Sequence, residues 1–213
     1  QTRKIEFAMS DSRQIASPAT IIPVARPHLP SCDALTKYLK LIDENRWYSN
    51  FGPLYRLFME RLSDHFEIKP SNIVGVANAT AALTTVILAI GCERNKYCLM
   101  PSWTFFATPS AALNAGLVPY FLDVDLETGM LSPAHVYEQA KRIGIDSIGC
   151  VMPVSAFGCP VDVQAWEAFH EQTKIPVVID AAAAFDSIRP STIPQCVSLH
   201  ATKVFGCGEG SVV

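Results

Sequence analysis

The sequence predicts an α/β protein, a three-layer α/β/α sandwich with a mostly parallel sheet of about seven strands. Short apolar segments alternate with helical segments along most of the chain, and such alternation is typical of a parallel sheet covered by helices on both faces. The length of 213 residues, 49% of them hydrophobic, suits one large domain with a sizeable buried core.

The expected strands are short apolar runs bounded by residues that favour turns. They cover residues 73–77, 97–100, 119–124, 147–154, 177–180, 196–200 and 211–213. Each but the last is followed by a loop or a helical pattern, so the chain crosses from strand to strand in the way that parallel pairing requires.

The expected helices are placed by hydrophobic spacing and by residues typical of helix ends. Ser31 is a typical N-cap, and Gly91 and Gly116 are typical of helix C-termini. Ser132 followed by Pro133 marks another start, because proline is favoured at the first helical position. The helices are expected at residues 32–45, 54–66, 80–90, 106–114, from 133 onward and at 161–173.

Residues 1–20 are polar and aperiodic, which predicts a flexible N-terminal arm before a folded domain at residues 21–213. The formal net charge of −3 argues against a nucleic-acid surface. No apolar run approaches the roughly 20 residues of a membrane span, and the N-terminus lacks the apolar segment of a signal peptide. We therefore expect a cytoplasmic protein that binds neither nucleic acid nor membrane.

The chain has seven cysteines and no Cys-x-x-Cys pair. Several lie in apolar strands, which indicates reduced, buried thiols and neither disulfides nor zinc ligands. Asp123 and Asp125 have no histidine nearby in the sequence, so we interpret them as a strand end and a turn. We expect no metal site.

Lys203 and Asp180 each end an apolar run. At a strand end the amine of Lys203 is expected to be partly desolvated, which favours its neutral form, and a neutral amine forms a Schiff base with an aldehyde. Pyridoxal phosphate enzymes need such an amine together with an acid for the pyridinium nitrogen. Taken singly, each residue has another interpretation. Lys203 could be a solvated lysine at the end of a strand, and Asp180 could cap the next turn. Four alanines follow Asp180, so we expect few side-chain partners for it.

A phosphate site is a second hypothesis. Asn78 to Leu83 follow the first strand and open a helix. Small side chains such as Ala79 let backbone N–H groups approach an anion, and Thr80 adds a hydroxyl donor. The alternative, an N-capped packing helix, is the commoner meaning of this pattern.

Other candidates lie in two further segments. Residues 101–108 carry three aromatic side chains; we expect one to stack on a flat cofactor ring and the other two to fill the core. Ser198 is a candidate donor to a phosphate. His200 shares its sheet face, and a histidine there is more often a core residue than a catalyst. Cys207 lacks a histidine partner in its surroundings and is not interpreted as a nucleophile.

Together these segments resemble the DegT–StrS family of sugar aminotransferases, within the aspartate aminotransferase superfamily of fold type I. The resemblance runs from about residue 22 to residue 213. Its most specific part is His-Ala-Thr-Lys at residues 200–203, followed by Gly-Glu-Gly at 208–210. The chain is expected to be the large domain of such an enzyme, with the family's C-terminal small domain absent.

The resemblance implies the cofactor pyridoxal 5'-phosphate (PLP) and a role for each motif residue. Lys203 would form the Schiff base, Asp180 would pair with the pyridinium nitrogen, and Phe105 would stack on the ring. The remaining cofactor residues would hold the phosphate: Ala79, Thr80 and Ser198.

The resemblance also implies a homodimer that transfers an amino group, usually from glutamate, to a keto sugar carried on a nucleotide. Ala183 departs from the family, which usually has His or Gln there, and Ser211 stands where a glycine is usual. A second function therefore stays open, a non-catalytic or degenerate fold type I domain that acts as a binding or assembly module. The presence of Lys203 and Asp180 favours catalytic ancestry.

Overall fold

The computed structural model describes Pro23 and residues 25–213, so the arm expected at residues 1–20 lies outside the described residues. Two helices come first, α1 (Cys32–Asn45) and α2 (Pro53–Phe66). Strands and helices then alternate: β1 (Gly75–Val76), α3 (Ala79–Ile90), β2 (Tyr97–Pro101), α4 (Ala107–Asn114), β3 (Val118–Leu122), α5 (Pro133–Ile143), β4 (Ile148–Val151), α6 (Val163–Thr173), β5 (Ile179–Asp180), β6 (Gln195–Ser198) and β7 (Ser211–Val212).

The strands form two ladders, in the orders β1-β7-β6-β5 and β3-β2-β4. Pairing is parallel between β2 and its two neighbours and between β5 and β6, whereas β7 runs antiparallel to β1 and β6. Isolated parallel bridges from Val151 to Val177 and from Val154 to Asp180 connect the two ladders. The predicted α/β class with a mostly parallel sheet is confirmed, although several strands are shorter than expected.

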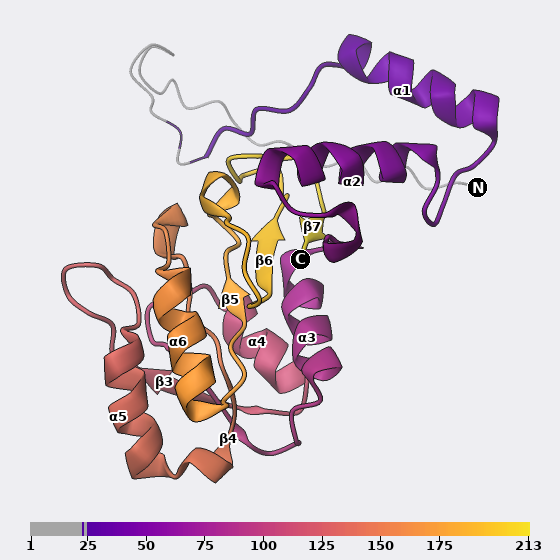
Figure 1. The fold of residues 1–213 in the computed structure, drawn as a ribbon. Coiled ribbons are helices and arrows are strands. Elements are labelled where there is room, and N and C mark those ends of the chain that lie inside the picture. The colour runs from indigo at the N-terminus through magenta and orange to yellow at the C-terminus, as the bar shows by residue number, and fades with distance from the viewer. Residues whose placement is uncertain (1–22, 24) are drawn as a thin grey trace, which may run out of the picture.

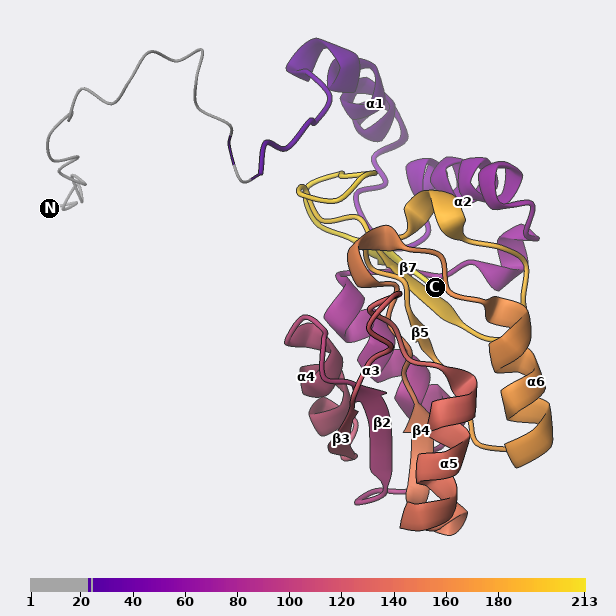
Figure 2. The same ribbon diagram turned by 90° about the vertical axis from the view of Figure 1, so that its left-hand side faces the viewer.

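Helices cover both faces of the sheet, with α3 and α4 on one side and α5 and α6 on the other (Figures 1 and 2). Successive strand residues point to opposite faces, so each strand supplies both cores. In β2, Leu99 packs in the cluster that contains Trp166, whereas its neighbour Cys98 packs in the cluster that contains Leu83. This two-sided burial explains why the strands are almost continuously apolar.

The helix ends follow from local hydrogen bonding. The side chain of Ser31 accepts from Ala34 N at 3.3 Å, as the sequence predicts for an N-cap. Asp162 accepts from Ala165 N at 3.0 Å, and its role as N-cap explains why α6 begins at Val163, two residues later than expected.

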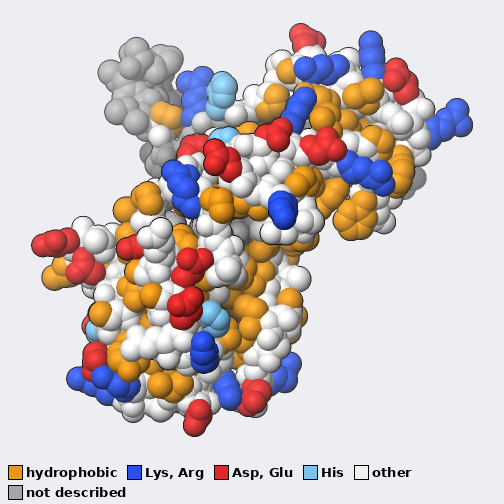
Figure 3. Space-filling model, in the orientation of Figure 1, with side chains coloured by type: hydrophobic (Ala, Val, Ile, Leu, Met, Phe, Trp, Pro, Cys, Tyr) orange, Lys and Arg blue, Asp and Glu red, His pale blue; other side chains and the backbone are white. Residues whose placement is uncertain are grey.

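The first helix stands apart from the three layers (Figures 1 and 2) and buries none of its residues. It touches α2 through a hydrogen bond from Arg61 Nη1 to the Tyr38 hydroxyl, 3.2 Å long. On the face shown in Figure 3, acidic and basic side chains are interspersed over these two helices. None of the helices in the described residues combines the length and apolar composition needed to cross a bilayer.

Trp166→Ala should lower the free energy of unfolding by about 3–5 kcal/mol, because it empties a packed core position. The side chain is 1% exposed and its ring meets that of Phe169 at 5.4 Å. Glu171→Ala, at an exposed position of the same helix, is the matched control and should change little. Urea unfolding of the two variants measures the difference, and equal losses would contradict this packing.

Candidate active site

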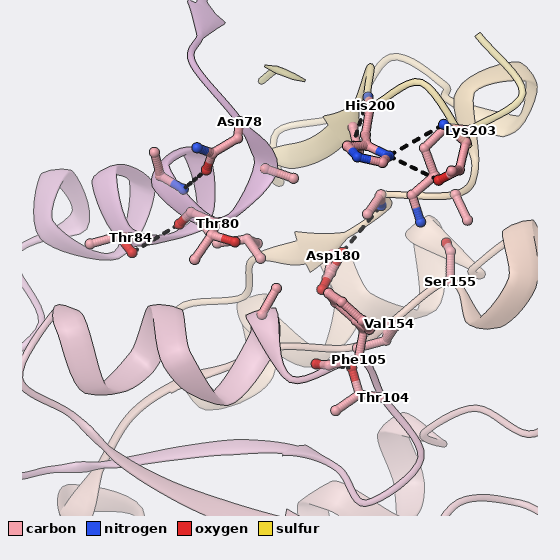
Figure 4. A pocket seen from close by; sticks show the side chains of 18 of the residues that line it. Asn78, Thr80, Thr84, Thr104, Phe105, Val154, Ser155, Asp180, His200 and Lys203 are labelled. Carbon is pink, nitrogen blue, oxygen red and sulfur yellow. Dashed lines mark hydrogen bonds between the residues drawn. The ribbon is translucent and has the colours of Figure 1, made fainter. Parts of the chain in front are cut away.

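A cavity of about 1050 Å³ lies at the carboxyl ends of the parallel strands, where open α/β sheets bind ligands. It is reached by the segments that follow β1, β2, β4, β5 and β6. Figure 4 shows how several of its side chains are arranged. The structure brings all six residues singled out in the sequence to its lining: Ala79, Thr80, Phe105, Asp180, Ser198 and Lys203.

Asp180 ends β5 and is 4% exposed. Its Oδ2 accepts a hydrogen bond from Thr108 Oγ1 at 2.7 Å, and its Oδ1 accepts from Ala182 N at 3.1 Å. As expected, the carboxylate has few side-chain partners: among the described residues only Thr108 bonds to it through a side chain, reaching it from α4, 72 residues away in the sequence. This threonine is fully buried and is the main site residue that the sequence did not indicate.

Burial raises the pKa of Asp180, because the charged form loses its solvation. The hydrogen bonds from Thr108 and Ala182 and the charge of Lys203 act in the opposite direction and offset only part of that cost. Thr108 has one hydroxyl proton and donates it to Asp180, so Thr104, 2.6 Å from Thr108, is the donor in their contact. The acid is thus held by neutral donors at the floor of the cavity.

Lys203 is half-buried and lies on the turn after β6. Among the residues that the structure describes, none forms an ion pair or hydrogen bond with its Nζ. The turn is closed by the Lys203 N–H, which donates to His200 O at 2.9 Å. The amine therefore reaches the cavity lining without a fixed partner.

His200 organises this turn. Its Nδ1 accepts from Thr202 N at 3.3 Å and lies 2.9 Å from Thr202 Oγ1. Because Nδ1 accepts, the proton of the neutral ring is on Nε2, which lies 3.6 Å from Glu209 Oε1. The side chain is 45% exposed, so the interpretation as a core histidine was wrong. Its contacts with Thr202 stabilise the turn that carries Lys203.

The start of α3 presents backbone donors to the cavity. Asn78 caps the helix by accepting from Ala81 N at 2.9 Å. The N–H groups of Ala79 and Thr80, the first two residues of the helix, have no acceptor among the described residues, as is usual at a helix N-terminus. The N-capped packing helix and the phosphate site are thus compatible, since the cap leaves these two donors free.

Ser198 ends β6 and is 6% exposed. Its Oγ accepts from His200 N at 3.2 Å. Within the described part of the chain its own hydroxyl proton has no acceptor, which leaves a buried donor available to a ligand in the cavity.

The aromatic side chains of residues 101–108 are exposed. Trp103, Phe105 and Phe106 are 55%, 69% and 70% exposed, so the expectation that two of these rings fill the core was wrong. The buried face of α4 consists instead of small residues, Thr108 among them. Phe105 lines the cavity with its ring 4.6 Å from that of Phe106.

Another aromatic ring at the cavity went unnoticed in the sequence. Phe157 follows β4, is 89% exposed, and its ring lies 6.1 Å from that of Trp103. Its backbone is left-handed, with φ 53°. The next residue, Gly158, has φ +85°, and a Cβ there would lie 2.6 Å from Ala183 O, so the turn packs directly on the segment after Asp180.

The described residues contain no group of three or more His, Cys, Asp or Glu side chains that could hold a metal ion. The cysteines are free thiols, and those in the sheet, Cys98, Cys150 and Cys196, are buried as expected. Burial raises the pKa of the Cys196 thiol, and the nearby charge of Asp180 adds to this shift.

Residues 32–213 match the profile of the DegT/DnrJ/EryC1/StrS aminotransferase family. The chain belongs to this family. Its members are PLP-dependent aminotransferases, which confirms the family and the cofactor class that the sequence motifs indicate.

Two curated relatives show the extent of the similarity. Protein Mb3436c of Mycobacterium bovis is 33% identical over 206 residues, covering 90% of this chain and 48% of that protein. The dTDP-4-amino-4,6-dideoxy-D-glucose transaminase of Shigella dysenteriae is 28% identical over 196 residues, covering 89% and 51%. The chain thus spans about half the length of the curated relatives it matches.

Solved structures agree with this assignment. A PLP-dependent aminotransferase from Bacillus cereus superposes with a TM-score of 0.80 at 31% identity, over 90% of this chain and 53% of the other. DesI, crystallised with its TDP-sugar product, gives a TM-score of 0.75 at 30% identity, over 89% and 48%. These neighbours confirm that the DegT/DnrJ/EryC1/StrS chain has the fold type I architecture.

The cavity fits PLP. Its buried carboxylate has neutral donors and calls for a cationic partner, which a protonated ring nitrogen provides. The amine of Lys203 has no partner among the described residues, and the free donors at Ala79, Thr80 and Ser198 suit a phosphate.

Asp180→Asn should raise the free energy of unfolding of the cofactor-free protein at neutral pH, by on the order of 1 kcal/mol. Asparagine removes a charge that burial disfavours. Its amide oxygen can accept from Ala182 N, and its NH2 group can donate to the Thr108 oxygen when the Thr108 hydroxyl turns to donate to Thr104. Since the folded-state pKa of Asp180 lies above the ordinary value of 3.8, the folded protein binds more protons than the unfolded chain just above that value. Wild-type stability therefore falls as pH rises through this window.

The difference in free energy of unfolding between Asp180→Asn and wild type should be smallest at acidic pH and increase toward neutral pH, as measured by urea unfolding across that range. Asp146→Asn, at an exposed position, is the control and should run parallel to wild type. If the difference in free energy of unfolding between Asp180→Asn and wild type does not depend on pH, burial does not disfavour the charge of Asp180 as we infer.

Proposed function

We propose that this chain is the large domain of a PLP-dependent aminotransferase that moves an amino group from glutamate to a nucleotide-linked keto sugar. The observation that carries the proposal is the pairing, in one cavity, of the buried Asp180 carboxylate with the unpartnered Lys203 amine. The substrate class is supported by the Shigella transaminase and by DesI with its TDP-sugar product. Homodimerisation, the glutamate donor and a cytoplasmic location are parts of the proposal that rest on the family resemblance.

When bound, PLP supplies an electrophilic carbonyl carbon and a ring that withdraws electrons from the substrate. Asp180 would hold the ring nitrogen in its protonated state. The carboxylate is already oriented by Thr108 and Ala182, and in a buried setting its attraction for a cation is stronger than in water. Its position would therefore set where the ring nitrogen lies in the cavity.

Lys203 would supply the amine that attaches the cofactor, and the same Nζ would carry a proton to and from the reacting carbon of the substrate. Ala79 and Thr80 would bind the phosphate through backbone N–H groups and a hydroxyl, with Ser198 as a further hydroxyl donor. Phe105 would lie against a ring face.

Lys203→Ala should abolish covalent attachment of PLP in the natural full-length protein, because no amine remains to bond its aldehyde carbon. Mass spectrometry after borohydride reduction measures the adduct, and Lys203→Arg should fail equally, since guanidinium stays protonated. Glutamate-dependent amination of a nucleotide keto sugar should be lost in both variants. An adduct that persists at another lysine would show that the site is misassigned.

Thr80→Val and Ser198→Ala should each weaken PLP binding by roughly tenfold or more, the worth of a hydrogen bond to a charged group. Their affinity for pyridoxal, which lacks the phosphate, should stay at the wild-type value. Equilibrium titrations with both compounds make the comparison in one protein. Equal losses for the two compounds would place the phosphate elsewhere in the cavity.

A further inference from the structure

A stack of aromatic rings connects the two segments that carry Asp180 and Lys203. Phe185 follows the acid by five residues and Phe205 follows the lysine by two. Their rings are nearly parallel, at 10°, with centroids 4.5 Å apart. This contact joins the end of β5 to the turn after β6 on the side of α2.

The stack continues onto α2. Phe58 lies on Phe205 with centroids 6.4 Å apart and an interplanar angle of 13°. Phe66 meets Phe185 at 5.0 Å. Phe66 and Phe185 are each 6% exposed, whereas Phe205 is 41% exposed. The ring of Phe205 therefore rests on a base that is fixed in the core.

Few other contacts hold the turn beyond Lys203. The Lys203 N–H donates to His200 O, and the two ends of the turn are joined by backbone bonds from Ala201 N to Gly208 O at 2.9 Å and from Cys207 N to Leu199 O at 2.8 Å. Among the described residues, no acceptor is present for the backbone N–H groups of residues 204–206. The ring contacts of Phe205 are thus the main attachment of residues 204–206, between the bonded ends of the turn.

The backbone of the turn is compact directly after Phe205. A Cβ on the following Gly206 would lie 2.7 Å from Ala201 O, so the chain folds back on itself directly after Phe205. Movement of residue 205 would consequently be passed to Lys203, which lies between the two ends of this turn.

We infer that Phe205 is a positioning residue for Lys203: its stacking on Phe185 and Phe58 fixes the turn and so holds the amine in register with the Asp180 carboxylate. The inference deepens the proposed function and rests on it. A lysine side chain has many rotamers, and reacting groups must be held within a fraction of an ångström for efficient chemistry. A rigid backbone below the lysine removes part of that freedom before the cofactor binds.

The first test needs no cofactor, because the Lys203–Val204 bond is itself a trypsin site. In cofactor-free, full-length protein, Phe205→Ala should raise the cleavage rate at this bond by roughly three- to tenfold, the worth of one aromatic pair. Phe121→Ala is the matched control, since Phe121 on β3 is 52% exposed and lies on no ring of the described residues. Phe205→Tyr keeps the ring and should restore slow cleavage.

The second test measures the cofactor. Phe205→Ala should weaken PLP binding by a similar factor. Its kcat should fall by more than its KM changes, while its melting temperature stays close to that of Phe121→Ala. Phe205→Tyr should recover both binding and kcat. This set of results supports positioning, because a purely structural role would change the melting temperature and leave the split between kcat and KM unmoved.

Three outcomes would overturn the inference: cleavage no faster than in Phe121→Ala, faster cleavage with unchanged PLP affinity, or a loss that Phe205→Tyr does not rescue. Absence of PLP binding in the wild-type protein would instead refute the proposed function. In that case the positioning role falls with it, and the trypsin rates still decide separately whether the ring anchors the turn.

Discussion

The burial of one carboxylate governs the architecture of this site. Asp180 is held at the end of β5 by two backbone bonds to the segment that follows β4, with its N–H donating to Pro153 O and its carbonyl accepting from Ser155 N, each 2.9 Å long. These bonds also connect the two ladders of the sheet at this point. The charge therefore sits on one of the most constrained parts of the fold, where it cannot move toward solvent to lower its energy.

The lysine is held in a different way. Lys203 belongs to a turn, and its backbone depends on the side chains of two neighbours, His200 before it and Phe205 after it. The acid therefore lies on a strand end and the amine on a turn, so the position of each group is set by a different element. The strand end sets where a cationic ring atom binds, and the turn sets where the amine can reach from there.

The sequence contained most of the fold and only part of the site. Alternating apolar runs and helix caps are local signals, so the order and approximate bounds of the elements could be predicted. Asp180 does end a strand as predicted, whereas Lys203 lies on the turn after β6, which ends at Ser198. Thr108 was missed because its contact with Asp180 spans 72 residues and depends on how α4 packs. The exposed rings near Phe105 and the strand lengths were misjudged for the same reason, since tertiary packing decides which apolar residues are covered.

The energetics of Asp180 bear on the choice between an enzyme and a binding module that merely keeps the fold. An asparagine oxygen would still accept from Ala182 N, and its NH2 group could donate to Thr108 once the Thr108 hydroxyl donates to Thr104, so the side chain could be paired without the cost that burial places on the charge. A domain with no cationic ligand would gain stability from that exchange, so the carboxylate is useful only where a cation offsets its cost. Ala183 differs from the family pattern, but it leaves the buried acid and the amine of Lys203 intact. The physical balance at Asp180 therefore favours a site that binds a cationic ring over a domain that has lost its ligand.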